Sequence, residues 1–217
     1  ELLFEPGQDS NILSIRFEST VCAHQALKFL FAGVPERWVT QVVNQRDGFE
    51  RMRSLGTDEP IQFEIYYREA KGERPITYEL AINLDDSGRP YVQSELLKQR
   101  RKGQKHGRPF PFLRLDHGKG KVWAGEEAVE GSQAEEDRAQ EDVELTDLRQ
   151  LGIATLGTLK EHPRIKRFRD FLKGWYLSYF NPDMARSIPS AGAQRHLNSH
   201  GDNMGNVVQY MEREHKD

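Results

Sequence analysis

The feature that most constrains the fold is a pair of runs in which apolar and polar residues alternate. In "IQFEIYY", residues 61–67, and in "ITYELAINL", residues 76–84, every second side chain is apolar. Successive side chains of a β-strand point to opposite faces of its sheet, so a period of two is typical of strands with one buried face. We therefore expect the two runs to be antiparallel neighbours in one sheet, with Ile65 and Leu80 facing the same core.

Turn residues further along the sequence predict additional strands of the same sheet. The turn "DDSG", which ends at Gly88, should lead into a third strand from about Tyr91. The run "FLRLDHGKGKVWA" predicts a further hairpin about Gly118 and Gly120. Residues 60–124 are thus expected to form an antiparallel β lobe.

Helices are expected on both sides of this lobe. The periodic run "AHQALKFLFAG" and the residues after it predict a helical segment over residues 22–45. The run "EHPRIKRFRDFLKG" predicts a helix with Pro163 in its first turn, Gly174 at its end and its Lys and Arg side chains on a solvated face. Its expected buried stripe is Ile165, Phe168, Phe171 and Leu172. "WYLSYF", residues 175–180, is predicted to be a buried strand, so the fold class is α/β, with an α+β arrangement within this chain.

The charges nearly cancel overall but are unevenly distributed. With 31 basic and 34 acidic residues the net charge is -3, so binding to nucleic acid has to be local. Residues 98–108 hold six Lys and Arg and no acid, whereas residues 126–147 hold ten acids against Arg138. The basic segment is a candidate nucleic-acid contact and the acidic one a decoy or partner tail, but solvated loops are the favoured interpretation, because no aromatic residue is interleaved. Residues 125–147 also lack a core pattern and are expected to form a mobile loop.

Cysteine content and hydropathy favour a cytoplasmic protein without a membrane partner. Cys22 is the single cysteine of the sequence, so no internal disulfide can form, and its helical surroundings favour an inert residue near the core. No apolar run approaches the length of about 18 residues that spans a membrane. The chain opens on Glu1 and closes on "EREHKD" within a helical pattern, which we interpret as an excerpt of a longer protein.

Three segments approach a phosphate-binding loop, and each lacks an essential residue. "GIATLGT" has Gly152, Gly157 and Thr158 at the correct spacing but no lysine. "GKGKV" has no hydroxyl residue after Lys121, and "FESTVCAH" contains no glycine. No catalytic triad is present either, so we assign no catalytic or cofactor-binding residue.

The segment "SIPSAGAQRHLNSHGDNMGNVVQY", residues 187–210, is interpreted as a structural joint. Gly192 and Gly201 permit unusual backbone angles, and Asp202 or Asn203 can cap a following helix. The expected buried stripe of that helix is Val207, Val208 and Met211. A partner or nucleotide contact and a metal site are alternatives. His196 and His200 are four residues apart, but they lie among turn formers and no carboxylate or thiol completes a ligand set, so no metal ligand is assigned.

Several long phrases occur in an order that resembles a known family. These are "RDGFERMRS", "PIQFEIYY", "LGIATLGTLKEHPRIKRFRDFLKGWYLSYFNP" and "IPSAGAQRHLNSHGDNMGNVVQYM". Across residues 26–211 they are similar to the middle of AAA-type ATPases with an SMC/RecF-like, ABC-class head. The resemblance implies part of a P-loop NTPase head with an antiparallel lobe and flanking helices. It also implies ATP and Mg²⁺ as cofactors, a homodimer through the heads, and DNA or a protein partner in DNA-linked or defence processes.

The sequence also departs from the pattern of that family. Where a strand and Walker A would precede the first helix it has "NILSIRFESTVCAHQ", and it stops at Asp217, before the signature and Walker B motifs. We therefore expect residues 1–217 to be a single incomplete head domain, with a helix, strand, joint and helix over residues 148–217, that does not itself hydrolyse ATP. The alternative is a non-catalytic interaction module derived from the same lobe.

Overall fold

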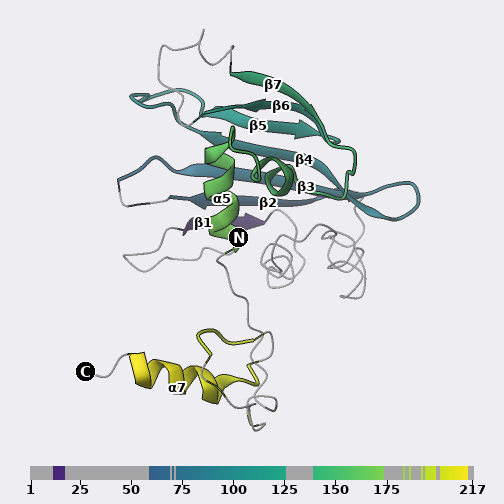
Figure 1. Ribbon diagram of the computed structural model, residues 1–217. Helices are drawn as coiled ribbons and strands as arrows, with labels where there is room; N and C mark the ends of the chain where they lie inside the picture. Colours follow the sequence, from purple (N-terminus) through teal and green to yellow (C-terminus); the bar gives the residue numbers. More distant parts are fainter. Residues whose placement is uncertain are drawn as a thin grey trace.

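The fold centres on one antiparallel sheet of seven strands that neighbour one another in chain order (Figure 1). The computed structural model describes residues 59–68, 72–125, 139–173, 194–198 and 201–214, the single residues 70, 183, 186 and 192, and the backbone of residues 12–17. The strands are β1 Ile12–Phe17, β2 Ile61–Tyr67, β3 Ile76–Leu84, β4 Pro90–Gln99, β5 Phe110–Asp116, β6 Lys119–Trp123 and β7 Gln140–Glu144. The helices are α4 Gly152–Leu156, α5 Pro163–Lys173 and α7 Met204–Glu214. The chain is therefore an α+β protein.

The pairing of β2 with β3 confirms the expectation from the alternating runs. The two strands are antiparallel, with Phe63 opposite Leu80 and Ile65 opposite Tyr78. Ile65 and Leu80 are both buried in the same core. Because β2 buries every second side chain, the register that pairs it with β3 also fixes which face is apolar.

The later strands confirm the predicted turns. β4 begins at Pro90, one residue before the expected start, and β5 and β6 form the hairpin about Gly118. His117 and Gly118 have φ angles of 47° and 72°, the positive values that a two-residue hairpin turn with the twist of its strands requires. Gly120 lies inside β6 rather than in the turn.

The two edges of the sheet extend beyond the predicted lobe. The sequence patterns did not predict β1, which pairs with β2. The acidic segment is not a loop throughout, because β7 lies within residues 125–147 and pairs with β6. Two of its acids, Asp142 and Glu144, lie opposite Lys121 and Lys119, with Lys119 Nζ 2.8 Å from Glu144 Oε1. Charge complementarity across the strands thus accompanies the backbone pairing where apolar burial is small. Residues 126–138 lie outside the described part of the chain.

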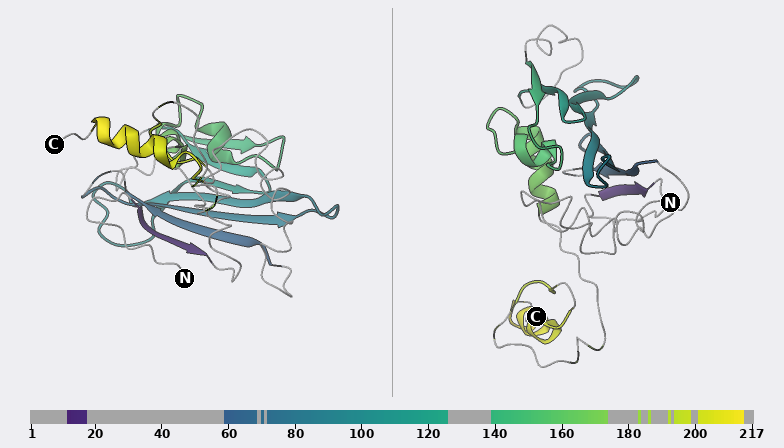
Figure 2. Two further views of the ribbon diagram at one scale, coloured as in Figure 1. Left: turned by 90° about the horizontal axis from the view of Figure 1, so that it is seen from below. Right: turned by 90° about the vertical axis from the view of Figure 1, so that its right-hand side faces the viewer.

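Helices α4 and α5 cover one face of the sheet (Figure 2, right). The predicted stripe of α5 is confirmed: Ile165, Phe168 and Leu172 are buried, and Phe171 is packed against the core. The ring of Phe171 stacks on Tyr67 of β2 with 3.9 Å between centroids. The prediction that the basic residues of α5 would all be solvated was wrong, because two of its arginines are buried.

Two arginines of α5 are buried. Arg164 is 4% exposed and Arg169 is 9% exposed. The guanidinium carbon of Arg164 lies 4.5 Å from the centroid of the Phe112 ring, and Arg169 forms an ion pair with Asp170 at 2.9 Å. The attraction between a guanidinium and an aromatic face offsets part of the lost hydration of Arg164, and the ion pair with Asp170 offsets part of that of Arg169.

Helix α7 does not bury the predicted stripe. Val208 is 46% exposed and Met211 is 56% exposed, while Val207 is partly buried and Asn206 is buried. α7 lies clear of the sheet in Figure 1, so its apolar residues do not contribute to the core under α5. The predicted helices over residues 22–45 and the strand over residues 175–180 lie outside the described residues. In the described part of the chain, no helix combines the length and apolar character needed to cross a membrane.

Candidate functional site

A carboxylate that sequence reasoning did not identify lies in the centre of the fold. Glu95 of β4 is 1% exposed and lies opposite Leu80 on one side and Leu115 on the other. It accepts hydrogen bonds from the Tyr78 hydroxyl at 3.1 Å and from the backbone amides of Gly152 at 2.5 Å and Ile153 at 3.0 Å. The last two donors are the first amides of α4, so Glu95 ties this helix to the sheet.

The environment of Glu95 alters its ionisation. Burial raises its pKa from 4.5 to about 7, although the hydrogen bonds from Ile153, Gly152 and Tyr78 each lower it. Burial, together with the carboxylate of Glu95, also raises the pKa of Tyr78 well above its usual value. Desolvation therefore outweighs the three donors, because a buried charge costs several kcal/mol before it is paired.

The same contacts explain the glycines of "GIATLGT", the closest approach to a phosphate-binding loop. Gly152 begins α4 and Gly157 follows its end, so both belong to a packed helical turn. A β-carbon at Gly152 would overlap Leu115 and come within 2.9 Å of Glu95 Oε2. The amides that would have to hold a phosphate already bind Glu95. These residues are therefore used for helix packing.

The basic segment forms an ordered loop between β4 and β5. Gln104 organises it, because its side chain accepts a hydrogen bond from the Arg101 amide and donates to the carbonyls of His106 and Arg108. Arg100 donates to the Lys105 carbonyl at 2.7 Å, which closes the turn. These bonds use backbone groups that would otherwise face water, so the loop is held in one shape.

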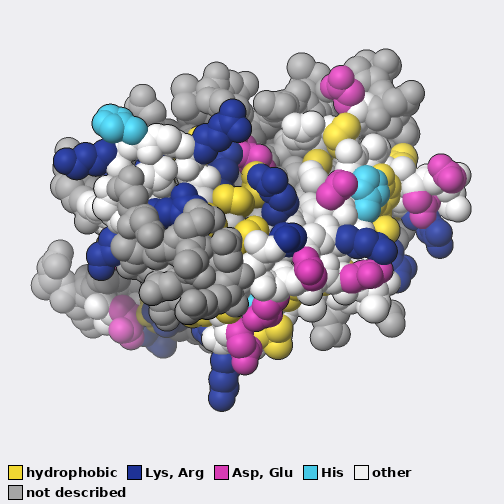
Figure 3. All heavy atoms as spheres, turned by 90° about the horizontal axis from the view of Figure 1, so that it is seen from above, with side chains coloured by type: hydrophobic (Ala, Val, Ile, Leu, Met, Phe, Trp, Pro, Cys, Tyr) yellow, Lys and Arg dark blue, Asp and Glu magenta, His cyan; other side chains and the backbone are white. Residues whose placement is uncertain are grey.

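The cations of this loop divide into anchored and exposed groups. Lys98 forms an ion pair with Glu79 of β3, and the guanidinium carbon of Arg101 lies 4.6 Å from the centroid of the Phe110 ring. Lys102, Lys105 and Arg108 are exposed. In Figure 3 dark blue side chains gather at one end of the molecule, whereas magenta and blue ones are interspersed at the other. The fold therefore concentrates positive charge at the end that carries the β4–β5 loop.

The predicted joint before α7 is held by Asn203. Its Oδ1 accepts a hydrogen bond from the Asn198 amide at 2.8 Å, and its Nδ2 donates to the His196 carbonyl at 2.9 Å and to Gln194. The side chain therefore binds the preceding turn instead of the helix amides that we expected it to cap. Gly192 and Gly201 have φ angles of 125° and 78°, as the joint interpretation requires.

Metal binding finds no support in the residues that the structure describes. Within them no group of three or more His, Cys, Asp or Glu side chains lies close enough to hold an ion. His200 and Cys22 lie outside the described residues. Comparison with known proteins also gives no guide to function: no family model, curated protein or solved structure matches this chain.

Proposed function

We propose that this chain is a non-catalytic lobe of an ATP-binding head of the AAA/ABC class, and that the lobe contacts the nucleic-acid backbone. The assignment to the P-loop NTPase class rests on the family resemblance of the ordered sequence phrases. The observation that carries the nucleic-acid contact is the β4–β5 loop, in which a fixed backbone presents Lys102, Lys105 and Arg108 to solvent.

The chemistry of this loop favours phosphate over bases. Lysine and arginine side chains neutralise phosphates and release counterions, which makes binding steeply dependent on salt. The aromatic ring at the base of the loop, Phe110, is buried and covered by Arg101, so it does not offer a face for base stacking. We therefore assign the loop to contacts that are independent of sequence.

A charge-reversal experiment tests this assignment. The Lys105→Glu/Arg108→Glu variant changes two exposed side chains of the loop, and the Lys160→Glu/Lys173→Glu variant makes the same charge change at exposed positions elsewhere. Fluorescence anisotropy with a labelled 20-base-pair duplex should show at least a tenfold loss for the loop variant. The slope of log affinity against log salt should also fall by about 2. Equal losses in both variants would contradict a contact through the loop.

The non-catalytic assignment has its own measurement. Since the amides of Gly152 and Ile153 are bound by Glu95, the chain should show no magnesium-dependent affinity for ATP in the micromolar range. Isothermal titration calorimetry with ATP·Mg checks this. Micromolar binding that disappears with EDTA would show that the chain holds nucleotide by itself.

A second candidate is a protein-interaction module, and one observation favours it. Met204, Val208 and Met211 are 40%, 46% and 56% exposed, and their spacing places them on one face of α7. The family resemblance implies a second copy of the head as the occupant. Sedimentation equilibrium should then show a dimer that Val208→Asp dissociates while duplex binding is retained. A wild type that is monomeric at all concentrations would rule out this role.

A further inference from the structure

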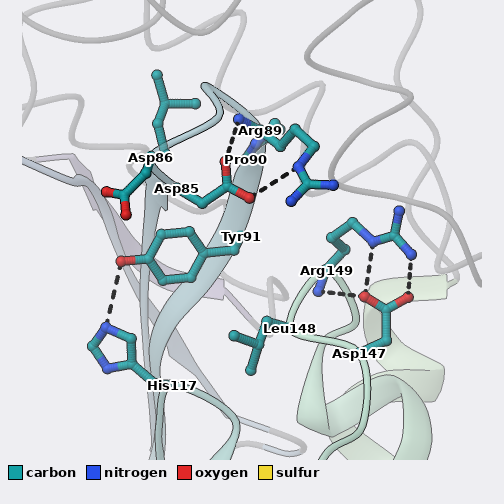
Figure 4. A pocket seen from close by; sticks show the side chains of 10 residues that line it. Asp85, Asp86, Arg89, Pro90, Tyr91, His117, Asp147, Leu148 and Arg149 are labelled. Atoms are coloured by element: carbon teal, nitrogen blue, oxygen red, sulfur yellow. Dashed lines mark hydrogen bonds and ion pairs between the residues drawn. The ribbon is translucent and has the colours of Figure 1, made fainter.

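At the end of the sheet opposite the basic loop lies a hollow of about 450 Å³, and Figure 4 shows the side chains that line it. It is bounded by the turn between β3 and β4, the start of β4, the tip of the β5–β6 hairpin and the segment between β7 and α4. Backbone bonds hold these walls together: Val92 donates to the Leu148 carbonyl at 2.8 Å, and His117 donates to the Gln93 carbonyl at 2.7 Å. Its volume is in the range of small-molecule sites.

Two aspartate–arginine turns form neighbouring walls of the hollow. Asp85 Oδ1 accepts from the amides of Ser87 and Arg89, and its Oδ2 accepts from Arg89 Nε at 3.0 Å. Asp147 accepts from the Arg149 amide at 3.0 Å and from Nε and Nη2 of the same side chain at 2.8 and 2.9 Å. Each aspartate therefore fixes the direction of one arginine by binding both its backbone and its side chain.

Each arginine keeps donors for a ligand after these bonds are made. Arg89 uses only Nε, and Arg149 uses Nε and Nη2, so in the described part of the chain both Nη groups of Arg89 and Nη1 of Arg149 have no partner. In Figure 4 the two guanidinium groups extend from neighbouring walls, with Leu148 and Tyr91 between them and His117. Arginines held in this way lose little conformational entropy when they bind an anion.

The remaining surface of the hollow is apolar with one polar end. The ring of Tyr91 and the side chain of Leu148 are part of its lining, and the Tyr91 hydroxyl lies 3.4 Å from His117 Nε2. The Nδ1 atom of His117 lies 3.1 Å from Asp116 Oδ1, so both ring nitrogens of His117 lie near a polar group. The apolar lining therefore suits a flat ring. Tyr91 and His117 offer hydrogen-bonding groups at the end away from the arginines.

The charge around the hollow limits what it can hold. Two aspartates are neutralised by their arginines, but Asp86 also lines the hollow and adds a further negative charge. The hollow therefore holds an anion through the directed Nη donors of Arg89 and Arg149 and not through net positive charge, and Asp86 repels a polyphosphate more strongly than a single anionic group. We propose that the hollow binds a small flat ring carrying a single anionic group, the chemistry shared by a nucleoside monophosphate and an aromatic carboxylate.

Calorimetric titration of the full chain with four probes tests this proposal. AMP and benzoate each carry a ring and an anion, whereas adenosine lacks the anion and inorganic phosphate lacks the ring. We expect AMP or benzoate to bind at least tenfold more tightly than adenosine and phosphate, and whichever binds identifies the source of the ligand. A result in which neither binds more tightly than these controls would overturn the proposal.

Two variants locate the binding. Arg89→Gln/Arg149→Gln should weaken the tighter probe at least tenfold, whereas Lys160→Gln/Lys173→Gln should leave it unchanged. If the first variant does not fold, Arg149→Lys keeps the charge, loses the planar fork and should still weaken binding several-fold. Undiminished binding by a folded arginine variant would refute the site. The Lys105→Glu/Arg108→Glu variant should bind the probe normally, so this inference and the nucleic-acid proposal fail independently.

Discussion

Replacing Glu95 by Gln should alter how the stability of this protein depends on pH. The pKa of Glu95 rises from 4.5 to about 7 on folding because the carboxyl is buried. The folded state then binds a proton more strongly than the unfolded state between these values, so stability falls as the pH rises through this window. At about 1.4 kcal/mol per pKa unit, the free energy of unfolding should fall by roughly 3 kcal/mol between about pH 4.5 and pH 7. Above that window the contribution of Glu95 stays constant.

Glutamine keeps the shape of the side chain and removes its titration. Urea unfolding followed by circular dichroism at several pH values from 4.5 to 8 gives the free energy of unfolding of both proteins. Titration of histidines affects both proteins alike and cancels in the difference between them. We expect Glu95→Gln to gain about 3 kcal/mol relative to the wild type across the window. Parallel curves would refute the claim that folding raises the pKa of Glu95.

Three further predictions concern contacts in other parts of the structure. Gly152→Ala should destabilise the chain by about 2 kcal/mol or more in urea unfolding, since its β-carbon would overlap Leu115; an unchanged midpoint would contradict this packing. Asn203→Ala should lower the free energy of unfolding by about 1–2 kcal/mol and increase amide exchange at the start of α7, because it removes the hydrogen bonds to the preceding turn. Val208→Ala should change stability by less than about 0.5 kcal/mol, because Val208 is exposed. A larger loss for Val208→Ala than for Asn203→Ala would instead support the predicted buried stripe. His117→Asn should raise the midpoint of thermal unfolding, because asparagine tolerates the positive φ of 47° more easily than histidine. A lowered midpoint would show that losing the contact between His117 and Tyr91 of β4 costs more than the relieved backbone strain returns.

The central strands could be predicted from the sequence because their signal is local. In β2 and β3 the alternation of side chains directly reflects one buried face, and the residues expected in the core are buried there. The same holds for α5, where Pro163 begins the helix and the apolar residues repeat with helical spacing. The basic loop was also visible as a run of charges, but its fixed shape depends on Gln104, which no pattern identified.

The buried carboxylate was hidden by an irregularity of β4. The pairing register with β3 shifts between Ala81 and Ile82, so Val92 and Glu95 are both buried although they are three residues apart. A strict period of two does not place both on one face. Only the pairing of the strands and the arrival of α4 from 57 residues further along the chain bring Glu95 to its donors.

The edges of the sheet and the buried arginines also depend on tertiary structure. β7 carries Glu141, Asp142 and Glu144, a composition that does not favour a strand, and it is stabilised by pairing with β6 and by the lysines opposite it. Arg164 is buried because the ring of Phe112 lies beneath it in the folded chain. The sequence by itself thus determined the strands whose burial follows from their own alternation. The tertiary structure decided that Glu95 and Arg164 are buried, because their desolvation is offset by partners that lie far away in the sequence.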